Sequence, residues 1–230
     1  EIPVVRGGQA ALYTDSMGER GKTMKDIIDV SRYQGNIDWD KLAGKIGGAM
    51  LKTVSTNKSF GGIYIDPMFE TNYAACKRLG IPVGVYYYTY AQTKATADAE
   101  LAKLHEALTG KSFELPIAVD VEDNKLKPLS AAALSELVAY AADTIESWGL
   151  YAMVYTYTYY SNTELDMDAL AAYDLWIADY TGKRPSRKHG MWQYTSKGSL
   201  PGISGNVDKN HVYKDYPGII RRTGLTCLRG

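Results

Sequence analysis

Short apolar runs alternate with helical patterns from residue 26 onward. The apolar runs are rich in β-branched residues and tyrosine, as buried strands are, and the segments between them keep one apolar face at helical spacing. Gly80, Gly110 and Gly149 each follow a helical segment, where a C-terminal glycine cap belongs. The expected strands are 26–31, 49–54, 83–88, 117–121 and 151–157, and the expected helices are 38–46, 67–79, 94–108, 129–148 and 164–172. Repeated βα units predict a parallel sheet.

The last part of the chain has a different pattern. Three strand-like segments, 175–179, 191–195 and 206–212, are separated by short stretches rich in glycine, proline and serine. A parallel crossover needs about a dozen residues or more, usually a helix, so we expect these strands to return as hairpins. Five βα units and three further strands make eight strands, the number that closes a barrel filled by its own side chains. The predicted fold is α/β, a single irregular TIM-like barrel of five βα units followed by three strands without helices.

Residues 1–25 show neither the helical nor the alternating strand spacing of apolar residues over any sustained length. They also lack the basic stretch followed by an apolar stretch that an intact signal peptide has. No linker-like composition interrupts the chain after residue 26. We therefore expect an extended lead-in or linker over 1–25 and one barrel domain over 26–230.

Composition excludes several classes of protein. The chain of 230 residues has 26 Lys+Arg and 26 Asp+Glu, and a net charge of zero argues against binding nucleic acid or anionic membranes through bulk charge. No apolar run approaches the ~18–20 residues of a membrane span. Two cysteines exclude a disulfide scaffold, and whether Cys76 pairs with Cys227 stays open. The 19 tyrosines against 3 phenylalanines suit sugar-stacking surfaces, although tyrosine can also replace phenylalanine in a core.

The strongest candidate for chemistry is the segment 117–123, Ile-Ala-Val-Asp-Val-Glu-Asp, where an apolar strand runs directly into acids. The two-residue period of a strand places Asp120 and Glu122 on the same face, with Cα atoms about 6.5–7 Å apart. In a parallel barrel the C-terminal strand ends form the catalytic face. Two adjacent buried carboxyls raise at least one pKa, which makes a general acid at neutral pH. The alternative is a solvated acidic turn.

Two further acids occupy equivalent places. Asp29 lies inside the apolar strand Ile-Ile-Asp-Val-Ser, and Asp208 lies on the last strand. Barrel closure would bring the last strand beside the first, so Asp29 and Asp208 could share a site with Asp120 and Glu122. The alternative for Asp29 is a structural pair with a buried cation, for which Lys52 is the obvious partner.

Aromatic residues recur at or near the C-terminal ends of four expected strands. Central carboxylates between aromatic walls are what a polysaccharide hydrolase needs, although a single ring more often belongs to the core. The expected substrate-binding rings are Tyr86, Tyr88, Tyr155, Trp176, Tyr180 and Trp192. We expect no cofactor and no metal, because Gly110-Lys111-Ser112 lacks the first glycine of a phosphate loop and the three histidines are scattered.

Seven ordered motifs between about Asp26 and Tyr213 resemble glycoside hydrolase family 25, the Chalaropsis-type lysozymes of bacteria and phages. The motifs begin at Asp29 (DVSRYQGNIDW), Asp66 (DPMF), Gly80 (GIPVGVY), Asp120 (DVE), Leu175 (LWIADY), Met191 (MWQY) and Gly205 (GNVDKN). The resemblance implies a barrel of five βα units followed by three strands. It also implies hydrolysis of the β-1,4 bond between N-acetylmuramic acid and N-acetylglucosamine in peptidoglycan.

Carried over by motif, Glu122 is the general acid, Asp120 is its neighbour on the strand, and Asp29 and Asp208 are the other acids of the site. The partner implied is the peptidoglycan glycan strand, for an enzyme that acts as a monomer. Its location would be secreted or wall-associated in a bacterium, or release by phage lysis. After the second-strand lysine the family usually has a small residue, Thr or Ser, then Glu-Gly. Here Lys52 is followed by Thr-Val-Ser-Thr, with Ser55 replacing the acid.

Two other functions stay open from the sequence. One is a catalytically inactive wall-binding barrel, against which the intact acids argue. The other is a chitinase-like hydrolase, whose strand also ends in Asp-x-Glu.

Overall fold

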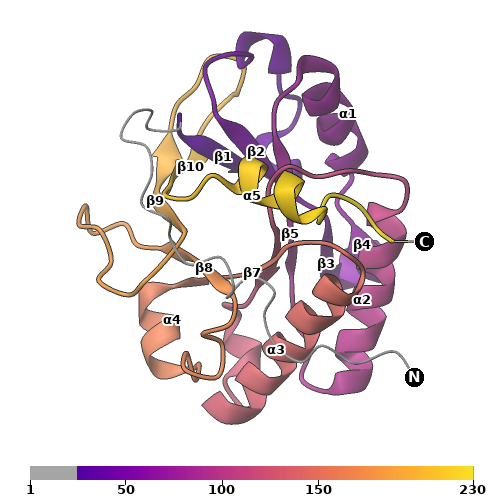
Figure 1. The fold of residues 1–230 in the computed structure, drawn as a ribbon, viewed down its shortest axis with the longest axis vertical. Coiled ribbons are helices and arrows are strands. Elements are labelled where there is room, and N and C mark those ends of the chain that lie inside the picture. Colours follow the sequence, from indigo (N-terminus) through magenta and orange to yellow (C-terminus); the bar gives the residue numbers. More distant parts are fainter. Residues whose placement is uncertain (1–24, 230) are drawn as a thin grey trace.

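The computed structural model describes residues 25–229, and its strands close into one barrel (Figure 1). The strands follow the order β1, β10, β9, β8, β7, β6, β5 and β2 around the barrel. They are β1 Ile27–Val30, β2 Gly48–Lys52, β5 Val83–Tyr88, β6 Ile117–Asp120, β7 Ala152–Tyr157, β8 Asp174–Ala178, β9 Met191–Gly198 and β10 Val207–Val212. The predicted eight-stranded α/β barrel is confirmed. The lead-in predicted over 1–25 lies, apart from Lys25, outside the described residues.

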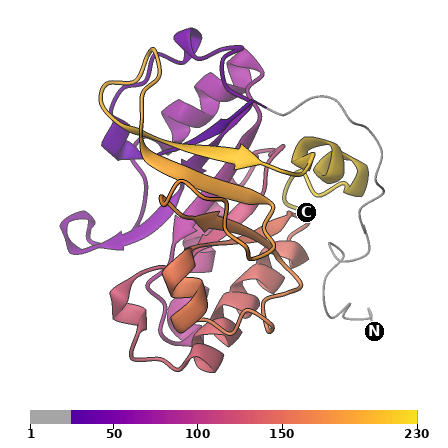
Figure 2. The ribbon, with the colours of Figure 1, turned by 90° about the vertical axis from the view of Figure 1, so that its left-hand side faces the viewer.

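Three long helices cover the outside of the parallel strands (Figures 1 and 2). They are α1 Phe69–Leu79, α2 Lys94–Leu108 and α3 Ala131–Ser147. The side chains of Thr93 and Ser130 accept backbone N–H bonds at the starts of α2 and α3, and Gly80 ends α1 in the left-handed conformation with a φ of 65°. These local signals explain why the three helices form where the sequence predicted them.

The prediction that the last strands return as hairpins is half wrong. Strand β10 is antiparallel to both β9 and β1, but β9 is parallel to β8. The connection 179–190 carries the chain back without a helix, and it is held in place where the Arg184 guanidinium stacks 3.8 Å from the centre of the Tyr213 ring. An irregular connection of this length is therefore sufficient for a parallel crossover here.

Two of the five predicted helices are not formed. The helix expected over 164–172 is replaced by turns, because the Asp166 side chain accepts the backbone N–H groups of Asp168 and Ala169, and the short α4 (Thr158–Thr163) precedes them. The segment 38–46 contains only a 3₁₀ helix, Trp39–Lys41. The sequence interpretation also missed the hairpin of β3 (Val54–Asn57) and β4 (Gly62–Ile65), and the helix α5 (Tyr216–Thr223).

The core has two large parts and a small outer cluster of Leu175, Ile177 and Trp192. One lies between the strands and the outer helices, and the other fills the barrel itself with side chains that include Ile27, Met50 and Met153. At Gly84 a Cβ atom would lie 2.6 Å from the Met50 sulfur, so glycine leaves the space that Met50 occupies. Tyr216 and Ile220 of α5 join the interior cluster and close the end of the barrel at which the parallel strands begin.

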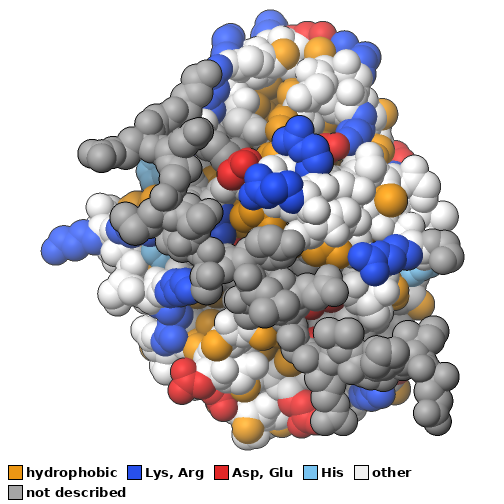
Figure 3. All heavy atoms as spheres, viewed as in Figure 1, with side chains coloured by type: hydrophobic (Ala, Val, Ile, Leu, Met, Phe, Trp, Pro, Cys, Tyr) orange, Lys and Arg blue, Asp and Glu red, His pale blue; other side chains and the backbone are white. Residues whose placement is uncertain are grey.

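Both cysteines are free: Cys76 is buried and Cys227 is exposed. None of the described helices is long and apolar enough to cross a lipid bilayer. The face seen in Figure 3 carries basic and acidic side chains intermixed, as the net charge of zero leads one to expect.

Candidate active site

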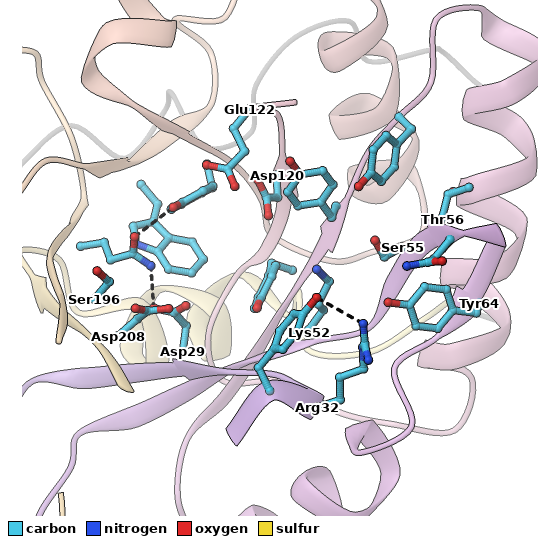
Figure 4. Close-up of a pocket in the computed structure, with 18 of the residues that line it drawn as sticks. Asp29, Arg32, Lys52, Ser55, Thr56, Tyr64, Asp120, Glu122, Ser196 and Asp208 are labelled. Carbon is cyan, nitrogen blue, oxygen red and sulfur yellow. Dashed lines mark hydrogen bonds between the residues drawn. The ribbon is translucent and has the colours of Figure 1, made fainter. Parts of the chain in front are cut away.

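The C-terminal ends of the parallel strands surround a cavity of about 440 Å³ (Figure 4). All four acids that the sequence singled out lie in its wall: Asp29, Asp120, Glu122 and Asp208. They come from β1, from β6 and the residues directly after it, and from β10. The barrel thus brings together acids that lie far apart in the sequence.

Asp120 is the last residue of β6, and Glu122 follows it on the same side of the chain. Asp120 is 3% exposed, and its buried Oδ1 has no hydrogen-bond partner within the described part of the chain. Burial raises the pKa of Asp120 well above its ordinary value, and the charge of Glu122 raises it further. Burial also raises the pKa of Glu122 to about 7, against the opposing positive charge of Lys52. The two carboxyls therefore compete to hold a proton near neutral pH.

Asp29 and Asp208 form a second carboxyl pair. Their backbones stand opposite each other in the β1–β10 ladder, and their side chains share a hydrogen bond. Burial is the main cause that raises the pKa of both. The amides of Gln193 and Asn210 each donate to Asp29 Oδ2 at 2.9 Å. The alternative in which Lys52 neutralises Asp29 is wrong, because these groups are its partners and the Lys52 charge acts on Asp120 and Glu122.

The sequence interpretation missed the polar residues that orient the second pair. The hydroxyls of Tyr155 and Tyr180 both donate to Gln193 Oε1, at 2.9 and 2.6 Å. The Trp176 indole donates to Asn210 Oδ1 at 2.7 Å. A single available signal was that Gln193 and Asn210 are uncharged polar residues inside otherwise ordinary strands, where burial requires hydrogen-bond partners.

Five of the six predicted rings line the cavity: Tyr86, Tyr88, Tyr155, Trp176 and Tyr180. The placement predicted for Trp192 is wrong. Along β9 side chains alternate, so that Met191 and Gln193 face the barrel interior and Trp192 points outward, where it packs with Leu175 and Ile177. Its indole N–H donates to the Asp179 carbonyl at 2.9 Å.

The β3–β4 hairpin supplies another wall, which the sequence interpretation did not foresee. Ser55, Thr56, Asn57 and Tyr64 from this hairpin line the cavity, together with Arg32. Ser55 is buried on β3 at 5% exposed, so the residue that departs from the family pattern faces the site itself. Within residues 25–229, no group of three or more His, Cys, Asp or Glu side chains is arranged to hold a metal ion.

Comparison with known proteins identifies relatives of this chain. The sequence profile described as glycosyl hydrolases family 25 matches residues 28–203. The Escherichia coli K12 protein YegX, itself described as uncharacterized, is 30% identical over 189 residues, which are 80% of this chain and 67% of YegX. The autolytic lysozyme of Clostridium acetobutylicum is 30% identical over 183 residues, which are 79% of this chain and 53% of that protein.

Solved structures share the fold. The modular autolysin LytC of Streptococcus pneumoniae superposes with a TM-score of 0.71 at 30% identity, over 82% of this chain and 46% of LytC. LytC has also been solved with a synthetic peptidoglycan ligand. The lysozyme of Streptomyces coelicolor superposes with a TM-score of 0.74 at 23% identity, over 88% of this chain and 100% of that chain. This chain spans about half the length of the Clostridium and Streptococcus proteins.

Proposed function

The chain belongs to glycosyl hydrolase family 25, and we propose that it is a muramidase that cleaves the β-1,4 bond between N-acetylmuramic acid and N-acetylglucosamine in peptidoglycan. The observation that carries this proposal is the environment of Glu122. This carboxyl group lies in the cavity beside a second buried carboxyl, that of Asp120, and burial raises its pKa to about 7. Such an acid keeps its proton near neutral pH and can donate it to the leaving glycosidic oxygen. The lysozymes among the relatives support the same reaction.

Asp120 is the partner of this acid. Repulsion between adjacent buried carboxylates favours a single negative charge on the pair. The proposal assigns the proton to Glu122 and the negative charge to Asp120, which the positive charge of Lys52 stabilises. Asp120 Oδ1 is buried and lacks a hydrogen-bond partner among the described residues, so it can accept the N–H of the substrate 2-acetamido group. Held in that orientation, the acetamide carbonyl oxygen can attack the anomeric carbon, and Asp120 stabilises the positively charged oxazoline-like intermediate.

This assignment gives a retaining, substrate-assisted mechanism. Asp120 and Glu122 leave the same strand on the same side, whereas an ordinary retaining enzyme needs its nucleophile across the sugar from the acid. Asp29, oriented by Gln193 and Asn210, and its neighbour Asp208 hold the sugar on the other side of the site. The second possibility is inversion, in which Asp29 or Asp208 activates a water molecule.

The aromatic walls have two roles in this proposal. Tyr180 is 54% exposed at the rim, and its ring is available to stack on a sugar. Trp176 is 1% exposed and shapes the floor of the site. Tyr86, Tyr88 and Tyr155 form the rest of the cavity wall.

In this proposal the binding partner is the glycan strand of a bacterial cell wall. The enzyme acts as a monomer, and it is secreted, wall-associated or released by phage lysis.

Mass analysis of the products from purified peptidoglycan tests the proposal. We expect new reducing ends at N-acetylmuramic acid, and loss of at least 10²-fold of the rate in the Glu122→Gln variant. Circular dichroism confirms that the variant is folded.

Other products would point to the alternatives. Cleavage of chitin oligosaccharides in preference to peptidoglycan would favour a chitinase-like enzyme. Binding to walls without any product, equal in the unaltered chain and in Glu122→Gln, would favour an inactive wall-binding barrel.

A further inference from the structure

Two cations line the cavity, and they have different surroundings. The charge of Lys52 lowers the pKa of Asp120 and Glu122, so it balances the acids of the site. Within residues 25–229, no carboxylate forms an ion pair with the Arg32 guanidinium, and its buried Nε has no hydrogen-bond partner. Arg32 therefore brings to the cavity a positive charge that is in direct contact with no described carboxylate; its nearest electrostatic partners are the Tyr64 hydroxyl and, without an ion pair, Asp66.

Asp66 is the acid that contacts the backbone of Arg32. Its carboxylate accepts the backbone N–H of Arg32 at 3.1 Å and of Met68 at 2.9 Å. Asp66 is 3% exposed, so its oxygens are occupied by the backbone rather than turned to the guanidinium. It fixes the backbone of Arg32 and leaves the charged end of the side chain open to a ligand.

Two rings hold the guanidinium in place without an anion. Its central carbon lies 4.6 Å from the centre of the Tyr33 ring and 5.0 Å from that of Phe60, and Nη2 donates to the Tyr33 hydroxyl at 3.2 Å. The rings are themselves open to solvent, with Tyr33 75% and Phe60 41% exposed. A planar cation held between exposed apolar rings is preorganised for a ligand that combines a carboxylate with a small apolar group.

Arg32 lies in the same cavity as the acids proposed to act on the glycosidic bond. Figure 4 shows Asp29 and Asp208 on one side of the cavity, Arg32 and Tyr64 on the other, and Asp120 and Glu122 between the two sides. A sugar bound at Asp120 and Glu122 therefore has Arg32 within the same cavity, beyond its edge on the side of the β3–β4 hairpin. A substituent that points from that sugar toward the hairpin would approach the guanidinium.

We propose that Arg32, with Tyr33 and Phe60, is a specificity site for a carboxylate carried on O3 of the muramic acid residue. The inference rests on the proposed muramidase function and names the feature of the substrate that this chain selects. Muramic acid differs from glucosamine by a lactyl ether, which is a methyl group and a carboxylate on one carbon. A guanidinium accepts a carboxylate in two parallel hydrogen bonds, and the exposed rings give the methyl group an apolar contact. The carboxylate is that of a free lactyl group or that of a peptide attached to it.

Binding to the Glu122→Gln variant tests this inference without turnover. The probes are a peptide-free tetrasaccharide of alternating N-acetylglucosamine and N-acetylmuramic acid, its lactyl carboxamide, an alanyl-glutamyl derivative, and the amide of that derivative. Calorimetry should show tighter binding of one acid form than of its amide by about tenfold or more, the range expected for a hydrogen bond to a charged group. The acid form that shows the preference identifies the source of the carboxylate.

Substitution of Arg32 then tests whether this residue causes the preference for the acid form over its amide. Adding Arg32→Gln to Glu122→Gln should remove the tenfold difference by weakening the acid form alone, and Arg32→Lys should restore part of it. The matched control is Arg78→Gln, which removes an exposed arginine paired with Asp40 on the surface. It should leave the preference unchanged.

Three results would overturn the Arg32 inference: equal affinity for acid and amide, equal weakening of both by Arg32→Gln, or no binding of any muramyl probe. The muramidase proposal is judged separately, by turnover of peptidoglycan in the unaltered chain. An enzyme that releases muramic acid reducing ends without a carboxylate preference contradicts only the role of Arg32. A chain that prefers the carboxylate but yields no such ends contradicts only the proposed activity.

Discussion

Asp29 and Asp208 face each other across the seam where the first and last strands of the barrel join (Figure 4). The two strands are antiparallel there, so the residues are direct partners in the ladder, and their carboxyl groups share a hydrogen bond. Asp120 and Glu122 form the other carboxyl pair of the cavity. The site therefore contains two coupled acid pairs rather than four independent carboxylates.

The proposed role of Glu122 as general acid predicts the pH dependence of the reaction. The pKa of Glu122 is about 7, and a general acid acts only in its protonated form, so we expect kcat/KM on a soluble glycan to fall as pH rises through about 7. The fall should approach tenfold per pH unit at higher pH. The rate profile between pH 4 and 9 measures this, and a rate that stays constant to pH 9 would rule out Glu122 as the acid.

The same group makes the folded state less stable at high pH. The pKa of Glu122 rises from 4.5 to about 7 on folding, so the folded chain holds the proton more tightly than the unfolded chain. The free energy of unfolding that Glu122 contributes therefore falls between about pH 4.5 and 7, and above pH 7 it falls no further. We expect Glu122→Gln to be more stable than the unaltered chain by about 1–3 kcal/mol at pH 8, and no more stable at pH 4. Urea unfolding at both pH values checks this, and an equal difference at both would contradict it.

Two aromatic residues should separate folding from substrate binding. Trp192 is 8% exposed on the outer face and donates to the Asp179 carbonyl, so Trp192→Phe should reduce stability by about 1–3 kcal/mol while KM changes less than twofold. Tyr180 is 54% exposed at the cavity rim, so Tyr180→Ala should raise KM several-fold with little loss of stability. Thermal unfolding and kinetics of both variants form the test, and a raised KM in Trp192→Phe would return that ring to the substrate.

The stereochemistry of the first product decides between the two mechanisms. We expect NMR to detect the β-anomer first, because attack by the acetamide and then by water gives two inversions at the anomeric carbon. Asp120→Asn should reduce kcat by at least 10²-fold, and substrates without the acetamide should not be cleaved. An initial α-anomer would instead show inversion and remove the proposed role of Asp120.

Asp29 and Asp120 could be found from the sequence because each is a charge in a place that burial should forbid. Asp29 interrupts an apolar strand, and Asp120 ends another. The alternation of a strand fixed the shared side of Asp120 and Glu122, and barrel closure predicted the meeting of Asp29 with Asp208. These inferences needed only the strand period and the number of strands.

The errors have two origins: a local pattern that was not followed through, and tertiary contacts that no local pattern shows. Trp192 was assigned to the cavity from its place near a strand end, although alternation about an inward-facing Gln193 would have turned it outward. The β3–β4 hairpin was missed because its strands have only four residues each and β3 is mostly polar. Arg32 was missed because nothing local links a residue after β1 to Phe60 beyond β3. Such links depend on which loops the barrel places side by side.

The seam between β1 and β10 leads us to expect a particular order of assembly. Asn210 reaches Asp29 across 181 residues of chain, so this contact closes a loop of almost the whole barrel and carries a large entropic cost until the intervening strands are in place. Asp120 and Glu122, by contrast, are neighbours in the sequence and take their relative positions as soon as β6 forms. Synthesis on a ribosome delivers Asp29 early and Asp208 late. We therefore expect the final pairing of strands to complete the acid cluster. The proposed hydrolytic activity would then report complete folding, which a helical spectroscopic signal from α1, α2 and α3 does not.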